Sequence, residues 1–298
     1  MENNQVVTSV DNNDQQANTK KNKLSRKTSR KSPKKLGVFG RSMAIFSDLL
    51  LTAAVIIGLY LIYLVWWTGV VANFAQQDLA KQFTWDMPVD ITKVATPHYD
   101  NIPCTVEPTE VASMIGRIYI PHFGADYVRN LVEGTDKTKV LDLQGFGHYS
   151  KTAMPGCVGN FASAGHRGGF GNSLLKIDEL KSGDTFAVRT QHFWFVYELY
   201  KHEVVDADHG EVLDPIPSNT SSYVSKDAEQ YSGGKMSFTP REQNEAHERL
   251  ATFTTCNPRW QTINRYIAHF KLKYWANIAG DDGGVPKELL DVGVKIVS

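Results

Sequence analysis

The chain has 298 residues, enough for one large domain or two smaller ones. Its 32 basic and 32 acidic side chains cancel to a formal net charge of zero, but residues 1–41 hold ten Lys or Arg against three acidic residues, a net of +7. An uncharged apolar segment follows this tail at once, which argues against a nucleic-acid-binding arm.

The basic tail, residues 1–41, is dominated by Asn, Gln, Lys and Ser. Such a composition cannot bury enough apolar surface to offset the loss of chain entropy on folding, so we predict a disordered segment.

The next segment, LLLTAAVIIGLYLIYLVWWTGVV at residues 49–71, contains no charged side chain. At about 1.5 Å per residue, a helix of this length crosses the roughly 30 Å hydrocarbon core of a bilayer. A secretory signal peptide is the alternative, but its apolar region is about 7 to 15 residues long and ends at a small-residue cleavage site. This segment is longer and ends near Trp66 and Trp67. We therefore predict a retained transmembrane helix over residues 42–72.

The basic tail predicts the orientation of the chain in the membrane. Positively charged flanks remain on the cytoplasmic side, so the tail is expected inside and everything after about residue 72 outside. Residues 73–112 are expected to form a juxtamembrane helix and then an extended linker, since four prolines lie between residues 88 and 108. Residues 113–298 are expected to form the extracellular domain.

The external domain alternates short strand-like runs with Gly- and Pro-containing turns, which is typical of a mainly β domain, closed barrel or sandwich. Two short helices are expected, in SLLKIDEL and in PREQNEAHERL. Residues 274–298 show no pattern that assigns them to a strand or a helix. The expected strands are IGRIYIP, TFAVRT, FWFVYELYKHEVV, LATFTTC and RYIAHFKLKYW.

Three cysteines in an exported domain leave at least one thiol unpaired within the chain. Cys104 lies in the linker and Cys157 in a Gly-flanked loop, so a disulfide between them would leave Cys256 reduced. The sequence supplies no distance that decides this pairing.

Cys256 ends a strand-like run, where a thiol is placed to act as a nucleophile if a cation favours its thiolate. His166, in ASAGHRGGFGN, follows small residues that leave space for another molecule, and Arg265 opens the next strand nine residues after the cysteine. Each residue taken alone is more often structural than catalytic. Their conjunction is what indicates an active site.

Ordered motifs from about Ile115 to Trp275 resemble those of the sortase family. The resemblance rests on IGRIYIP, VEGTD, GFGHYSKTAMPGCVGNFASAGHRGGFG, IDELKSGD, EVVDADHGEVLDPIP and TFTTCNPRW. It implies an eight-stranded β-barrel with few short helices and a membrane-anchored cysteine transpeptidase. Such enzymes cleave an LPxTG-like motif near the C-terminus of secreted proteins between Thr and Gly.

The same resemblance implies the roles of individual residues. Cys256 would be the nucleophile, His166 the acid and base, and Arg265 the group that holds the substrate and stabilises charge on the carbonyl oxygen. Thr255 would assist substrate and oxyanion binding, and His148 would support the substrate site. This division of labour matches the general logic of acyl transfer.

The implied partners are secreted proteins with a sorting signal and an amine acceptor, either a cell-wall precursor or a pilin lysine. No cofactor and no nucleic-acid partner is expected. A metal site is not expected either, because the remaining histidines are scattered without ligand spacing. The alternatives are a pilin-polymerising enzyme and a barrel that binds peptides without catalysis.

CNPRW and AHFKL are most similar to class E sortases of actinobacteria, some of which prefer LAxTG. Two positions depart from the family pattern: Phe253 replaces the Leu of TLxTC, and HRGGFG replaces HRTTYG.

Overall fold

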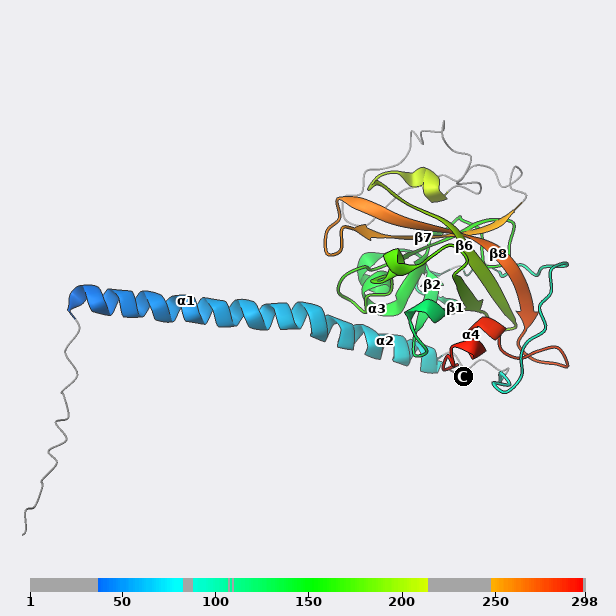
Figure 1. The fold of residues 1–298 in the computed structure, drawn as a ribbon, viewed down its shortest axis with the longest axis horizontal. Coiled ribbons are helices and arrows are strands. Elements are labelled where there is room, and N and C mark those ends of the chain that lie inside the picture. Colours follow the sequence, from blue (N-terminus) through cyan, green and yellow to red (C-terminus); the bar gives the residue numbers. More distant parts are fainter. Residues whose placement is uncertain (1–36, 83–87, 107, 109, 214–247, 297–298) are drawn as a thin grey trace, which may run out of the picture. The chain divides into compact units, whose positions relative to one another are not determined.

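The computed structural model describes residues 37–82, 88–106, 108, 110–213 and 248–296 (Figure 1). The predicted disorder of the basic tail, residues 1–41, lies outside the described residues as far as residue 36. Residues 38–41 differ from that prediction, because they form the first turn of a helix. Most of the helix predicted in PREQNEAHERL also lies outside the described residues. Its last two residues, Arg249 and Leu250, begin a strand instead.

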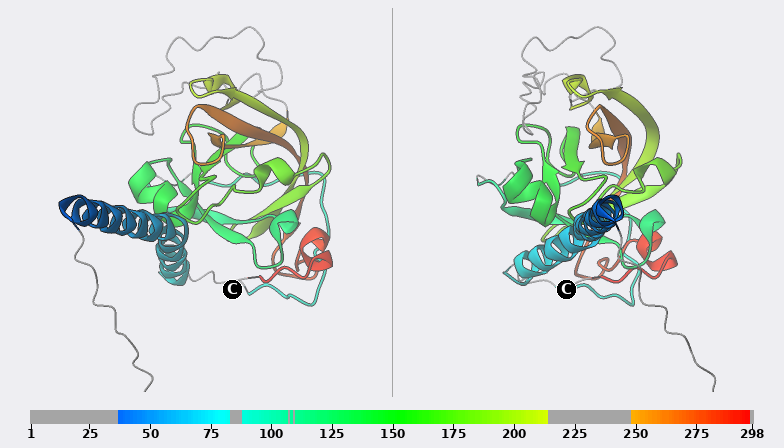
Figure 2. Two further views of the ribbon diagram at one scale, coloured as in Figure 1. Left: turned by 60° about the vertical axis from the view of Figure 1, so that its left-hand side comes forward. Right: turned by 90° about the vertical axis from the view of Figure 1, so that its left-hand side faces the viewer.

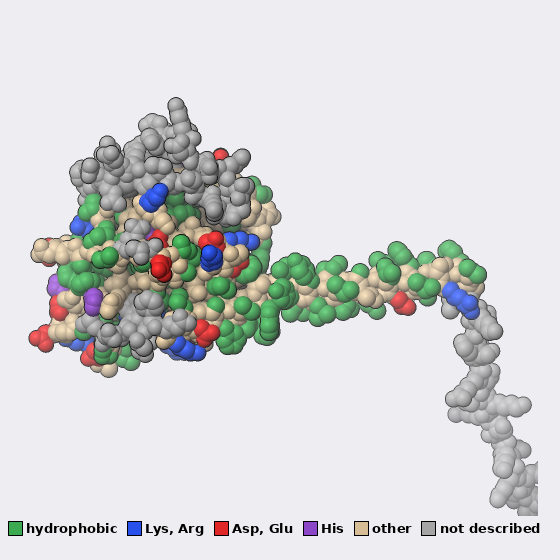
Figure 3. All heavy atoms as spheres, turned by 180° about the vertical axis from the view of Figure 1, so that it is seen from behind, with side chains coloured by type: hydrophobic (Ala, Val, Ile, Leu, Met, Phe, Trp, Pro, Cys, Tyr) green, Lys and Arg blue, Asp and Glu red, His purple; other side chains and the backbone are tan. Residues whose placement is uncertain are grey.

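The described chain begins with α1 (Val38–Ile62), which passes through a π-helical turn, η1 (Tyr63–Trp67), into α2 (Thr68–Gln82). Helix α1 is long and apolar enough to cross a membrane by length and composition, and hydrophobic side chains cover its surface (Figure 3). The chain divides into two compact units, Met1–Ala53 and Ala54–Ser298. A helix was predicted from residue 73; α2 begins five residues earlier, at Thr68, and its juxtamembrane position stays a prediction.

Eight strands close into a barrel, as the family resemblance implies (Figure 2). The order around the barrel is β1-β2-β3-β4-β7-β8-β6-β5, with β2–β3 and β4–β7 parallel and the other pairs antiparallel. The strands are β1 (Met114–Tyr119), β2 (Val128–Glu133), β3 (Gly145–His148), β4 (Gly159–Gly165), β5 (Thr185–Arg189), β6 (Phe193–Asp206), β7 (Arg249–Asn257) and β8 (Asn264–Asn277).

Few helical segments connect the strands. The turn predicted in SLLKIDEL is the 3-10 helix η4 (Ile177–Glu179). The other helical segments that the structure describes in this unit are η2 (Pro121–Phe123), η3 (Lys137–Leu141), α3 (Asp142–Gln144) and η5 (Gly210–Leu213) between strands, and α4 (Lys287–Asp291) after β8.

Aromatic side chains fill the barrel because alternate residues of each strand point inward. Phe253 lies at the centre of this core, fully buried, with its ring centroid 4.4 Å from that of Phe186, 5.0 Å from Phe146 and 5.1 Å from Phe270. The departure from the family's Leu at this position is therefore accommodated by aromatic packing.

The C-terminal segment, which the sequence left unassigned, covers the outside of the barrel. Residues up to Asn277 extend β8, and Val285 and Leu289 pack with Trp194 in a second apolar cluster. The indole nitrogen of Trp194 donates to the carbonyl of Gly284 at 3.0 Å.

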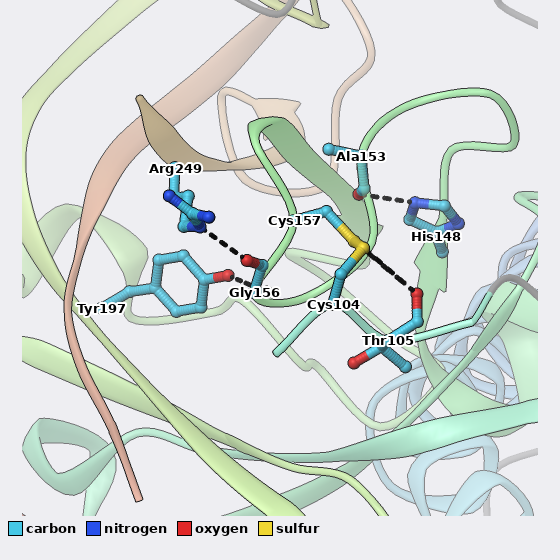
Figure 4. The surroundings of a disulfide bond; sticks show 8 residues. All are labelled: Cys104, Thr105, His148, Ala153, Gly156, Cys157, Tyr197 and Arg249. Carbon is cyan, nitrogen blue, oxygen red and sulfur yellow. Dashed lines mark hydrogen bonds between the residues drawn. A yellow bond between two sulfur atoms is a disulfide. The ribbon is translucent and has the colours of Figure 1, made fainter. Parts of the chain in front are cut away.

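The predicted linker lies along the barrel in an extended course. Val94 and His98 form isolated bridges with Val285 and Trp275. A disulfide between Cys104 and Cys157 then joins the linker to the loop before β4 (Figure 4). This pairing, which the sequence could not decide, leaves Cys256 as the free cysteine.

Candidate active site

Cys256 and Arg265 are direct partners across the antiparallel pair β7–β8. Residues that face each other in this way project from the same face of a sheet, with their Cβ atoms about 4.5–5.5 Å apart. The residues between them therefore form the turn of a β-hairpin, which places Arg265 opposite Cys256 although the two are nine residues apart in sequence.

His166 reaches Cys256 from the other side, through the parallel pair β4–β7. The register pairs Ala164 with Thr254 as the last pair of the ladder, so β4 runs alongside β7 up to the residues just before His166 and Cys256. The hydroxyl of Thr255 donates to the carbonyl of Gly165 at 2.6 Å, which fixes the two strand ends next to each other. The order β4-β7-β8 thus sets the thiol between the histidine and the arginine.

A small cavity of about 40 Å³ lies above these strand ends. Four of the five predicted site residues line it together: Cys256, His166, Arg265 and Thr255. Cys256 is partly exposed, while Arg265 and Thr255 are buried. The remaining lining residues are Thr135, Leu141, Tyr149, Ala164, Gly165 and Thr254.

Asp142 contacts the predicted catalytic histidine, a residue that the sequence analysis did not identify. Its Oδ1 lies 2.7 Å from Nε2 of His166, and both side chains are mostly buried, at 15% and 16% exposure. A carboxylate in this position fixes the orientation of an imidazole ring. In this orientation Nδ1 is the ring nitrogen left for proton transfer.

Arg167, the residue after His166, links the two strand ends that carry the histidine and the cysteine. Its Nη1 donates to Oδ1 of Asn257 at 2.5 Å, and its Nη2 lies 3.0 Å from Asp178. Arg167 is 4% exposed, and its guanidinium lies over the ring of Tyr266 at 5.0 Å. These contacts hold the residue next to His166 against the residue next to Cys256.

The ion pairs around Asp178 support that link. Burial raises the pKa of this carboxyl, but hydrogen bonds from Arg259 and Arg167 outweigh it and leave the pKa below its usual value. Asp178 is therefore ionised at neutral pH and retains both arginines.

Arg265 is held by the backbone of its own hairpin. Its Nη1 donates to the carbonyls of Thr262 and Asn264 at 3.1 and 3.0 Å. These bonds reduce the freedom of a side chain that would otherwise have many rotamers. The guanidinium is thus preorganised beside the thiol.

His148 lies apart from the lining of the cavity. It is fully buried, with Nδ1 2.7 Å from Glu133 and Nε2 3.0 Å from the hydroxyl of Thr152. Its ring stacks at 5.8 Å on Phe161. These contacts describe a packed, hydrogen-bonded residue, and its predicted support of the substrate site stays a prediction.

Within the described part of the chain, no group of three or more His, Cys, Asp or Glu side chains is arranged to hold a metal ion.

Comparison with known proteins connects this geometry to a family. A family model described as a sortase domain matches residues 118–273, which is more than half of the chain. Sortase SrtE2 of Streptomyces coelicolor is 28% identical over 258 residues, which cover 85% of this chain and 90% of that protein. Sortase SrtE1 of the same organism is 29% identical over 231 residues, covering 76% of this chain but only 55% of that protein. The solved structure of the SrtA sortase from Actinomyces oris has a TM-score of 0.51 and 29% identity, covering 65% of this chain and 96% of the other.

Proposed function

The chain belongs to the sortase family of cysteine transpeptidases, and from this premise we propose that it cleaves a C-terminal LPxTG- or LAxTG-like sorting motif between Thr and Gly. The protein part up to Thr is held as a thioester on Cys256 and then transferred to an amine of the cell wall. The observation that supports the proposal is that Cys256, His166 and Arg265 line one cavity, with Cys256 and Arg265 paired across β7–β8.

In the first half of the reaction, the sulfur of Cys256 attacks the carbonyl carbon of the motif's Thr. The attacking species is the thiolate, which is far more nucleophilic than the thiol. As the C–S bond forms and the C–N bond breaks, His166 gives its proton to the departing Gly amine. The products are a thioester and a free amino group on the released fragment.

In the second half, an incoming amine attacks the thioester carbonyl. Its nitrogen loses a proton to His166, a new C–N bond forms, and the C–S bond breaks to return the thiolate of Cys256. The same imidazole thus acts as acid and then as base, and its proton is restored at the end of each cycle.

Arg265 and Thr255 serve the transition states of both halves. A fixed guanidinium stabilises negative charge that develops on the carbonyl oxygen, and it costs no reorganisation during the reaction. The proposal is supported by the backbone bonds that fix Arg265 and by the position of Thr255 in the wall of the same cavity.

We propose that α1 anchors the enzyme in the cell membrane with the N-terminus in the cytoplasm and the barrel outside. The length and apolar character of α1 and the net charge of +7 over residues 1–41 support this orientation. The barrel would then meet secreted substrates at the outer surface, where a cell-wall precursor supplies the amine.

The direct test uses the full chain purified in detergent. It is incubated with LAxTG and LPxTG peptides and triglycine, and the products are followed by mass spectrometry, with Cys256→Ala as the matched variant. We expect an amine-exchanged product from the wild type and none from the variant. The motif that reacts faster identifies the substrate class.

Cleavage of neither peptide by a folded wild-type chain would contradict the proposed motif. Exchange that persists in Cys256→Ala would contradict the proposed nucleophile. Replacing triglycine with a pilin-like lysine peptide as acceptor separates cell-wall anchoring from pilin polymerisation.

A further inference from the structure

Helix α2 has one buried face that points at the barrel. Thr68, Ala72 and Gln76 are 7%, 1% and 8% exposed, and they follow one another at the four-residue spacing that places side chains on one face of a helix. Phe74, on the opposite face, is 63% exposed, and Val71, at the edge between the two faces, is 42% exposed. The helix is thus docked against another part of the same compact unit.

The docked face lies on the loop that follows β4. The hydroxyl oxygen of Thr68 accepts a hydrogen bond from the backbone N–H of Phe170 at 3.3 Å. Gly171 lies against the helix: a Cβ built on it would be in van der Waals contact with Cβ of Ala72 at 3.4 Å and with Nε2 of Gln76 at 3.5 Å. The positive φ of +84° at Gly171 also favours glycine at this turn.

The same loop carries the catalytic histidine of the proposed reaction. The ring of Phe170 lies against that of His166, with centroids 5.3 Å apart. On the far side of the loop, a Cβ built on Gly168 would lie 2.7 Å from the ring of Trp260, in the β7–β8 connection. The loop is therefore held between α2 and the segment that follows the nucleophile.

Helix α2 also contacts the element that carries the histidine's partner. It packs against α3, whose first residue is Asp142 (Figure 1). Oε1 of Gln76 would lie 3.0 Å from a Cβ built on Gly145, directly after α3. The backbone carbonyl of Gln76 accepts from Nδ2 of Asn130 in β2 at 2.9 Å. Both members of the His166–Asp142 pair are thus backed by one helix.

We propose that α2 is a positioning element of the active site: its buried face sets the loop 166–171 and α3, and through them the orientation of the His166 imidazole. The helix touches no reacting atom and acts through Phe170 and the His166–Asp142 contact. Removal of these helix contacts leaves the barrel core in place but releases the catalytic histidine. This role rests on the acid–base function proposed for His166.

The test compares substitutions on the two faces of α2 in the full chain. Ala72→Leu adds three carbon atoms where the helix meets Gly171, and Val71→Leu adds one carbon atom at an exposed position. Thr68→Val removes the acceptor of the Phe170 N–H without changing the shape of the side chain, and Thr68→Ser retains it. The readouts are kcat and KM for amine exchange, amide hydrogen exchange over residues 166–172, and the thermal midpoint.

We expect Ala72→Leu to lower kcat roughly tenfold or more with KM within about twofold, because small displacements of a catalytic group are costly. Thr68→Val is expected to change kcat in the same direction, while Thr68→Ser and Val71→Leu stay near wild type. Both damaging variants should speed amide exchange in the loop with an unchanged barrel midpoint.

A kcat near wild type in Ala72→Leu and Thr68→Val would overturn the proposal, as would a fall in kcat without faster exchange in the loop. If the wild-type chain gives no exchanged product, the proposed reaction fails. Amide exchange of Phe170 in Thr68→Val then still decides whether α2 holds the loop.

Discussion

The Cys104–Cys157 disulfide closes a loop of 53 residues that contains β1, β2 and β3. Replacement of both cysteines by serine frees this loop in the unfolded chain. With 53 residues, the chain-entropy relation gives a loss of about 14 cal/mol/K, or about 4 kcal/mol at 25 °C. This is the stabilisation that we expect the bond to contribute.

The native structure around the bond has other supports, so the loss should come mainly from the unfolded state. The N–H of Gly156 donates to the hydroxyl of Tyr197 at 2.9 Å, and the carbonyl of Gly156 accepts from Nε of Arg249 at 2.9 Å (Figure 4). The N–H of Thr105 donates to the carbonyl of Pro155 at 3.2 Å. The turn at Cys157 is thus held in place without the disulfide.

The assay is thermal unfolding of the full chain in detergent, followed by tryptophan fluorescence. At about 2–4 °C per kcal/mol for a domain of this size, the double serine variant should unfold about 8–16 °C below wild type. Reductant should lower the wild-type midpoint to the same value and leave the variant unchanged. A shift below about 2 °C in both experiments would refute the entropic reasoning.

Three further predictions concern the core, the histidine pair and a buried titratable group. Phe253→Leu leaves a void among aromatic rings and should cost about 1–3 kcal/mol, read from the urea midpoint; an unchanged midpoint would show that the ring is not needed. Asp142→Asn should lower kcat roughly tenfold with little change in KM, and Asp142→Glu should retain part of the lost activity. Equal activity of Asp142→Asn and wild type would show that the carboxylate is not needed to orient His166. Burial lowers the pKa of His269, although Glu203 lies 3.0 Å away. The unfolded chain therefore binds more protons, and the stability of the folded state should fall as pH drops below about 6.5. In His269→Gln, the unfolding midpoint should depend less steeply on pH between pH 7 and 5. An equally steep dependence would assign the effect to other groups.

Much of the barrel could be read from local sequence. Residues 193–206 and 264–277 have the β-branched and aromatic composition of long strands, and both are strands. Their pairing was not readable, because the barrel order β7-β8-β6-β5 depends on contacts between residues far apart in the chain.

Only part of the candidate site could be predicted from the sequence, because its residues come from segments that are far apart in the chain. The step from Cys256 to Arg265 is local, so a hairpin explains it. The approach of His166 needs a parallel pairing across 90 residues, which only the family motifs suggested. Asp142 lies 24 residues before the histidine and within no motif that the sequence analysis used. His148 lies in one of those motifs, but its side chain is turned to Glu133 by the parallel pair β2–β3.

In the proposed reaction, the acyl group resides on Cys256 between the two half-reactions. Intact-mass spectrometry of the full chain, mixed with the faster peptide and no acceptor amine, tests it directly. We predict an adduct with the mass of the peptide up to its Thr, located on Cys256 after digestion and discharged by triglycine. Turnover without such an adduct, or an adduct that persists in Cys256→Ala, would rule out a thioester intermediate on Cys256.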